Sequence, residues 1–126
     1  MEDENLTELE NSIKSYFGVL NNDELKSITS LFKIEKLNKG DFFLETNKKC
    51  NRLSFIQSGY LRIFSETENK ETTQWISTKG YFVTDLSSFI FDQPARWTIQ
   101  ALTETTIYTI KKKEYKNFHE IVKQWS

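Results

Sequence analysis

The chain has 126 residues, of which 37% are hydrophobic and 14% aromatic, so a single domain with a substantial core is expected. Its 17 basic and 18 acidic residues nearly balance, which argues against a domain that grips nucleic acid by bulk charge. A single cysteine excludes an internal disulfide and favours a reducing, cytoplasmic location.

The N-terminal stretch MEDENLTELE is acidic and polar, which fits neither a signal peptide nor a transit peptide. No apolar run approaches the roughly 20 residues that span a bilayer, so no membrane association is expected.

Two amphipathic helices are predicted within residues 1–32. The first runs over 5–17 with Asn5 as its N-cap and Glu8 as the capping-box partner, and Gly18 ends it. The second is capped by Asn22 or Asp23.

Residues 33–110 change to a strand pattern in which short apolar runs alternate with turn residues. Ser58-Gly59 predicts a hairpin, Gly80 breaks a later run, and a turn is expected near Thr103-Glu104. Many short strands at fairly even spacing are typical of an antiparallel sandwich or barrel.

Residues 111–126 return to helical spacing, which predicts a C-terminal helix. Its apolar positions are Tyr115, Phe118, Ile121, Val122 and Trp125. The pattern stops at Ser126 without a helix-ending residue, so we expect a longer parent protein that continues past this point.

Taken in order, these segments resemble the cyclic-nucleotide-binding sensor domain of the Crp/Fnr (catabolite activator) transcription regulators. The resemblance rests on "NKGDFFLE", "LSFIQSGYLRIF", "KGYFVTDL", "IQALTETTIYTI" and "KKEYKNFHEIV". It implies a mainly β fold with flanking α-helices, a jelly-roll-like β-roll (a double-stranded β-helix). Residues 1–126 would then form one domain, with N-terminal helices at 1–32, the roll at 33–110, a ligand cassette at 84–98 and the terminal helix at 111–126.

In members that bind cyclic AMP, the cassette reads Gly-Glu-Leu, about nine residues, then Arg-Ser/Thr-Ala. The glutamate holds the ribose hydroxyl and the arginine neutralises the phosphate, as suits a carboxylate and a guanidinium. The resemblance places the candidate ligand site at Thr84, Asp85, Leu86, Ser87, Ser88, Ala95, Arg96 and Trp97.

The cassette departs from the family pattern, and three of its departures carry the prediction. Thr84 replaces the glycine, Ala95 occupies the seat of the phosphate arginine, and Trp97 replaces a small residue. Asp85 keeps the acid but shortens it by one methylene, and Arg96 lies one place late, which in a strand sends a side chain to the opposite face. A local bulge after Pro94 would restore it. We therefore predict that cyclic AMP is not bound in the usual way, which leaves another small or anionic ligand, or none.

Each cassette residue also has a plain structural interpretation. Asp85 caps a short helix, LSSFIF, and Ser87 and Ser88 satisfy turn amides. The residues 89–91, Phe-Ile-Phe, belong to the core, and Arg96 forms a surface salt bridge.

Outside the cassette the sequence offers little chemistry. The run Lys111-Lys112-Lys113 is interpreted as a solvated edge rather than a nucleic-acid contact. Cys50 and His119 are the only cysteine and histidine, so no metal site, iron–sulfur cluster or cofactor is expected, and a cupin-type metal enzyme is disfavoured.

The resemblance implies a regulatory, non-enzymatic function: the ligand-sensing half of a Crp/Fnr-like regulator that is a homodimer at full length. In that family a dimerisation helix and a helix-turn-helix follow the roll, so DNA would be bound only through a segment beyond Ser126. The alternative is an unliganded regulatory or interaction module of another protein.

Overall fold

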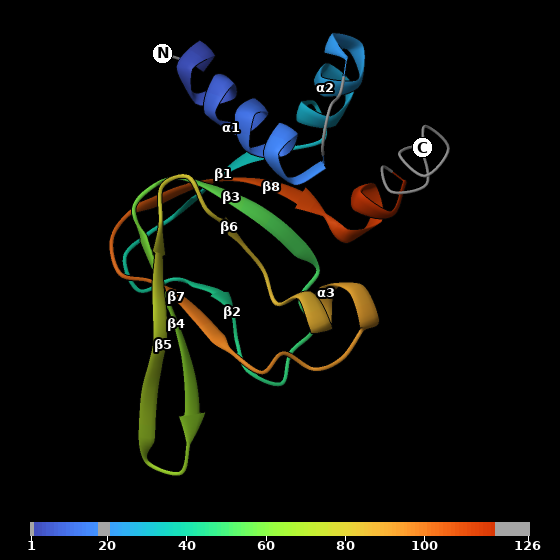
Figure 1. The fold of residues 1–126 in the computed structure, drawn as a ribbon. Helices are drawn as coiled ribbons and strands as arrows, with labels where there is room; N and C mark the ends of the chain where they lie inside the picture. The colour runs from blue at the N-terminus through green and yellow to red at the C-terminus, as the bar shows by residue number, and fades with distance from the viewer. Residues whose placement is uncertain (1, 18–20, 118–126) are drawn as a thin grey trace.

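The computed structural model describes residues 2–17 and 21–117. Two helices precede eight strands, a third short helix interrupts the strands, and residues 112–117 form a last helix (Figure 1). The elements are α1 (Glu2–Phe17), α2 (Asn22–Thr29), β1 (Lys33–Leu37), β2 (Phe42–Leu44), β3 (Arg52–Ser58), β4 (Tyr60–Thr67), β5 (Lys70–Thr78), β6 (Phe82–Val83), α3 (Leu86–Phe91), β7 (Thr98–Ala101) and β8 (Thr105–Lys111).

The helix starts differ from those predicted. α1 begins at Glu2, so Asn5 lies inside the helix and is not its cap. The N-cap of α2 is Asn21 rather than Asn22 or Asp23. The Asn21 side chain accepts from the Glu24 N–H at 2.8 Å, and the Glu24 carboxylate accepts from the Asn21 N–H at 3.1 Å. This capping box requires its acid three residues after the cap, a spacing that favours Asn21 over its neighbours.

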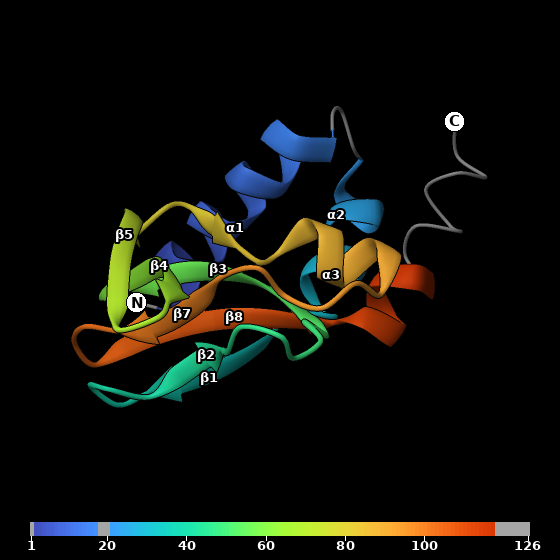
Figure 2. The ribbon, with the colours of Figure 1, turned by 90° about the horizontal axis from the view of Figure 1, so that it is seen from below.

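The strands form two four-stranded sheets with antiparallel pairing, in the orders β1-β8-β3-β6 and β2-β7-β4-β5 (Figures 1 and 2). We call these sheet A and sheet B. The prediction of a mainly β roll with N-terminal helices is confirmed. The predicted C-terminal helix is present at 112–117, whereas Phe118, His119, Ile121, Val122 and Trp125 lie outside the described residues.

The predicted Ser58-Gly59 hairpin is wrong, because β3 belongs to sheet A and β4 to sheet B. Gly59 is the corner at which the chain crosses between the sheets. Its φ is +97°, and a Cβ there would lie 2.4 Å from Thr105 Oγ1 and 2.6 Å from the Glu104 carbonyl oxygen. A glycine turn signal does not distinguish a corner between sheets from a hairpin within one. The hairpin that forms joins β4 to β5, where Asn69 has a φ of 60°.

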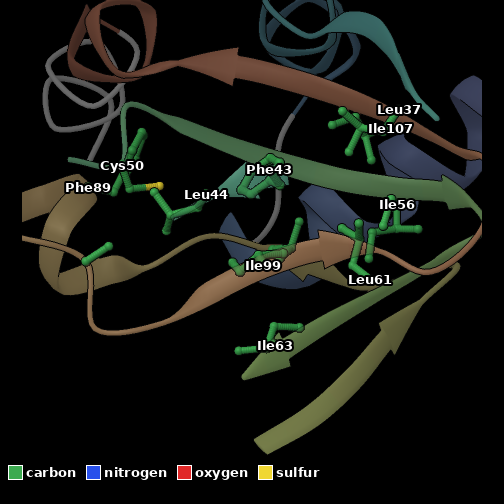
Figure 3. Close-up of a cluster of buried hydrophobic side chains, with 13 residues drawn as sticks. Leu37, Phe43, Leu44, Cys50, Ile56, Leu61, Ile63, Phe89, Ile99 and Ile107 are labelled. Atoms are coloured by element: carbon green, nitrogen blue, oxygen red, sulfur yellow. The ribbon is translucent and has the colours of Figure 1, made fainter. Parts of the chain in front are cut away.

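The two faces of sheet A bury two clusters of apolar side chains. On the outer face, Phe55, Tyr108 and Ile110 pack against Leu9 and Ile28 of the covering helices. On the inner face, side chains from both sheets meet, as Figure 3 shows for Ile56, Leu61, Ile99 and Ile107. Successive side chains of β3 and β8 therefore point alternately into the two clusters. Sheet A thus packs against the helices on one face and against sheet B on the other.

Candidate ligand site in the cassette

Asp85 is the buried centre of the cassette. It is the N-cap of α3, as predicted, and one carboxylate oxygen accepts from the Ser88 N–H at 3.2 Å. The other oxygen accepts from the Arg96 N–H at 2.9 Å, which ties the start of α3 to the far end of the cassette. Only 2% of the residue is exposed. Both carboxylate oxygens thus bond to main-chain amides of the cassette.

Ala95 lies against the loop that joins β2 to β3. It is 2% exposed, its N–H donates to the Lys48 carbonyl oxygen at 2.8 Å, and its carbonyl accepts from the Asn47 N–H at 2.8 Å. Ala95 is thereby fixed on both sides of its backbone, and its small side chain belongs to the inner core.

Arg96 is exposed and adjoins a pair of tryptophans. Its guanidinium carbon lies 5.7 Å from the centre of the Trp97 ring, a cation–π distance. The Trp97 ring in turn meets Trp75 of β5 edge to face, with 5.9 Å between centroids and 69° between planes. The predicted surface salt bridge of Arg96 is absent from the ion pairs of residues 2–17 and 21–117. Residues 92–97 precede β7, so the alternation that governs strands does not apply to Arg96.

Two of the remaining predicted residues make buried or partly buried side-chain hydrogen bonds, and the other two are at least partly exposed. The Thr84 hydroxyl donates to the Arg52 carbonyl at 3.0 Å, and the Ser88 hydroxyl accepts from the Cys50 N–H at 2.7 Å, so these two anchor the cassette to the start of β3. Leu86 is 61% exposed, and Ser87 is partly buried.

The apolar residues 89–91 do not all belong to the core. Phe89 is 1% exposed and contacts Tyr115 edge to face at 5.1 Å between centroids, which confirms its core assignment. Ile90 and Phe91 are 44% and 70% exposed, so the prediction was wrong for these two. A helix of six residues packs one stripe inward and turns the next residues to solvent.

Asp92 ends α3 in a left-handed conformation with a φ of 58°. Its carboxylate accepts a hydrogen bond from Lys112, the first residue of the helix at 112–117. This bond and the charge of Lys112 hold the pKa of the Asp92 carboxyl below its usual range, and Lys49 and Lys116 act in the same direction. The cassette is therefore linked to the last helix by an ion pair and by the Phe89–Tyr115 ring contact, and Figures 1 and 2 both show these elements side by side.

Sequence reasoning missed two parts of this region. One is Trp75, whose contact with Trp97 joins β5 to the end of the cassette; tryptophan on a polar strand was the available signal. The other is a polar chain in which Thr98 donates to Glu66 at 3.1 Å and its oxygen lies 2.8 Å from the Thr46 hydroxyl. Thr98 is the last residue of the cassette and the first of β7, a strand that reads only as apolar alternation and so gave no signal.

Within residues 2–17 and 21–117, no group of three or more metal-ligating side chains comes together. No helix within these ranges is long and apolar enough to cross a bilayer.

Comparison with known proteins identifies the family of this chain. The family model described as "Cyclic nucleotide-binding domain" matches residues 34–121. The chain belongs to the cyclic nucleotide-binding domain family, and the resemblance seen in the sequence is confirmed. A search of curated proteins found no match.

Solved structures share the fold at low identity. The Thermus thermophilus catabolite activator protein has a TM-score of 0.75 at 17% identity, covering 84% of this chain and 50% of that one. The sensor domain of the Pseudomonas aeruginosa transcriptional regulator DNR has a TM-score of 0.75 at 15% identity, covering 91% of this chain and 79% of that one. The regulatory subunit of a cAMP-independent protein kinase A from Trypanosoma cruzi, bound to guanosine, has a TM-score of 0.76 at 15% identity, covering 94% and 42%. The chain thus spans half or less of the catabolite activator and the kinase subunit.

Proposed function

We propose that this chain is the sensor domain of a Crp/Fnr-type transcription regulator. The family membership supports a ligand-sensing regulatory function, and two of the fold neighbours are bacterial regulators of this kind. On this proposal the domain is regulatory rather than catalytic, acts in the cytoplasm and forms a homodimer at full length. DNA is contacted through a helix-turn-helix outside this chain.

We further propose that the cassette does not bind cyclic AMP in the usual way. The residue that carries this proposal is Ala95, which the family resemblance aligns with the phosphate arginine and whose backbone makes two hydrogen bonds of 2.8 Å to the β2–β3 loop. The neighbouring guanidinium, on Arg96, is exposed and lies beside Trp97. A cyclic phosphate would therefore lack the charge-assisted, two-pronged contact that a guanidinium supplies.

The state of Asp85 supports the same conclusion. In cyclic-AMP-binding members the acid at this position holds a ribose hydroxyl, but here both oxygens accept main-chain N–H groups. A hydroxyl would have to share these oxygens or displace an amide in a buried site. Leaving a buried amide unpaired costs about 1–3 kcal/mol, which removes most of the gain from the new bond.

The aromatic pair favours a planar ligand that lacks a cyclic phosphate. Trp75 is 50% exposed and Trp97 partly buried, so their rings offer an apolar face beside the Arg96 guanidinium. Tryptophan faces stack well on flat heteroaromatic rings. A fold neighbour holds guanosine, a nucleoside without phosphate, which makes nucleosides the first compounds to test.

Isothermal titration calorimetry with cyclic AMP, cyclic GMP, adenosine and guanosine tests the proposal. Neither cyclic nucleotide is expected to bind at micromolar concentration, and micromolar binding of either would overturn this part. Binding of a nucleoside that Trp75→Ala abolishes and Tyr81→Ala leaves intact would support the planar ligand; Tyr81 is a matched exposed aromatic residue at 61%.

An unliganded interaction module is the second candidate, and the internally satisfied Asp85 favours it. Under this alternative none of the four compounds gives heat above dilution, and the Trp75→Ala variant is thermodynamically indistinguishable from the parent in every titration.

A further inference from the structure

A groove opens at one end of the roll, between β1, β2 and the helix at 112–117. Its volume is about 890 Å³. Its charged lining residues are Lys33, Glu35, Arg52, Lys111, Lys112, Lys113 and Glu114. The cassette residues 84–98 do not line it, so it is separate from the candidate ligand site.

The position of the groove follows from the pairing of sheet A. Arg52 pairs with Lys111 and Ser54 with Thr109, in the same register as the core pair Ile56 and Ile107. Alternate residues of a strand share a face, so Arg52, Thr109 and Lys111 lie on the inner face of the sheet. The groove is thus the continuation of the space between the sheets, where polar residues replace the apolar core.

The lining is strongly basic although the chain as a whole carries a net charge of −1. Five cationic and two acidic residues line the groove, an excess of three positive charges. The Lys33 ammonium donates to the Ser30 carbonyl at 3.2 Å and the Lys112 ammonium to Asp92, both outside the lining. A volume of this size lies within the range of about 300–1,000 Å³ that is typical of small-molecule sites. A concave site of one sign concentrates counter-ions of the other.

One of these cations is fixed in place before any ligand arrives. Arg52 donates to Glu35 at 2.9 Å and to the Phe43 carbonyl at 2.8 Å, and its guanidinium lies 4.2 Å from the centre of the Phe43 ring. Its side chain is only 21% exposed. Lys111 and Lys113 also line the groove, and they take part in none of the ion pairs found between described residues.

Lys112 connects the groove to the cassette. It lines the groove, yet its ammonium donates to Asp92 at the end of α3, which is not part of the lining. An anion in the groove would compete with Asp92 for this ammonium. Occupancy of the groove would then weaken one of the two contacts that link α3 to the last helix.

We propose that this groove is a second ligand site, for a small polyanion with at least two neighbouring phosphate or carboxylate groups, and that its ligand competes with Asp92 for Lys112. Lysine and arginine side chains gathered in one cavity recognise such groups by charge-assisted hydrogen bonds. Because the two sites share no lining residue, the anion site can be present whether or not the cassette binds a ligand.

The test is a titration of the ¹⁵N-labelled chain with inorganic triphosphate, at constant ionic strength, followed by amide chemical shifts. Saturable shifts are expected at Lys33, Arg52 and residues 109–113. Lys111→Gln with Lys113→Gln should weaken binding about tenfold or more, because two charge-assisted contacts are removed. The control pair Lys39→Gln with Lys70→Gln changes the net charge equally outside the groove and should leave the affinity within about twofold.

Asp92→Asn supplies the decisive variant. Asparagine tolerates the left-handed conformation at this position, so α3 should end as before. Without a competing carboxylate, Lys112 is free and triphosphate should bind about threefold tighter or more. A merely structural contact would leave the affinity unchanged or lower it.

Several results would overturn the proposal. The first is the absence of saturable chemical-shift changes. The second is an equal loss of triphosphate affinity in the Lys111/Lys113 and Lys39/Lys70 double variants. The third is an unchanged triphosphate affinity in Asp92→Asn. Citrate in place of triphosphate distinguishes a carboxylate ligand from a phosphate ligand. A 12-base-pair duplex that binds while both small anions fail would assign the lysines to nucleic acid instead, and would also reject the proposed site.

Discussion

At the scale of single residues, the Asp85 carboxylate holds the cassette together. The family resemblance aligns Asp85 with a ligand-binding acid, and in the structure its two oxygens join the start of α3 to the far end of the cassette. Its burial at 2% makes these bonds structural, because a lost partner leaves an amide that water cannot reach.

Asp85→Ala should lower the free energy of unfolding by about 2–3 kcal/mol, since it removes a helix cap and unpairs two amides. Urea denaturation measures the change. Asp41→Ala is the matched control, because Asp41 accepts from the Asn38 N–H at 2.8 Å in an exposed turn, and it should cost well under about 1 kcal/mol. Equal losses in the two variants would contradict the structural assignment of Asp85.

Gly59 is the second residue at which a single atom matters. Gly59→Ala should cost about 3 kcal/mol, because the new methyl group would meet Thr105 and the Glu104 backbone in addition to the strain of a positive φ. Gly80→Ala has a comparable φ of +94° but no atom within 4 Å, so it should cost only about 1 kcal/mol. Thermal or urea unfolding of both variants separates steric crowding from backbone strain. If Gly80→Ala lowered the free energy of unfolding as much as Gly59→Ala, the crowding at Gly59 would make no contribution.

At the scale of elements, the short α3 depends on its neighbours. Six residues cannot hold a helix in isolation, so capping by Asp85, burial of Phe89 and the Asp92–Lys112 pair keep it in place. Two of these contacts, through Phe89 and Asp92, reach the last helix. A movement of the last helix should therefore shift α3 through these two contacts.

The Asp92–Lys112 pair should make this link sensitive to acid. Lys112 lowers the pKa of Asp92 in the folded state, so the pair stabilises the fold above the unfolded pKa, and the contribution is lost as pH falls through the lower, folded pKa. The difference in unfolding free energy between the parent and Asp92→Asn should be constant near neutral pH and shrink below about pH 4. Denaturation across pH 2.5–7, roughly the range that covers carboxyl titration, measures it. A difference that grows in acid would contradict the direction of the shift.

At the scale of the whole molecule, sheet A makes the helices and the roll one unit. Phe55 faces the helices and the adjacent Ile56 faces sheet B, and both are fully buried. Because both apolar clusters pack on sheet A, disruption of either cluster destabilises the sheet and therefore the other cluster.

Phe55→Ala and Ile56→Ala should each lower the unfolding free energy by about 3–4 kcal/mol through a single transition. Far-ultraviolet circular dichroism reports the helices and tryptophan fluorescence reports the roll, so the two midpoints should coincide for both variants. Separate midpoints in Phe55→Ala would show instead that α1 and α2 unfold independently of the roll.

Much of the fold could be predicted from local pattern. The helical spacing of Leu9, Ile13, Leu25 and Ile28 and the glycine-punctuated strands identify the element types and their order. The cap of α3 was also predictable, because Asp85 precedes a short apolar run and capping is a local interaction. The frame of the cassette came from its resemblance to a family motif.

The sheet in which each strand lies, by contrast, depends on contacts distant in sequence. Ser58-Gly59 reads as a hairpin locally, and only the pairing of β3 with β8 and of β4 with β7 makes it a corner. The meeting of Trp75 with Trp97, the attachment of Ala95 to the β2–β3 loop and the gathering of lysines around Arg52 are likewise tertiary. The sequence by itself determined which kinds of local element form and in what order, because capping and periodicity act within a few residues. The tertiary structure decided which side chains face one another, because strand pairing joins residues that no local interaction connects.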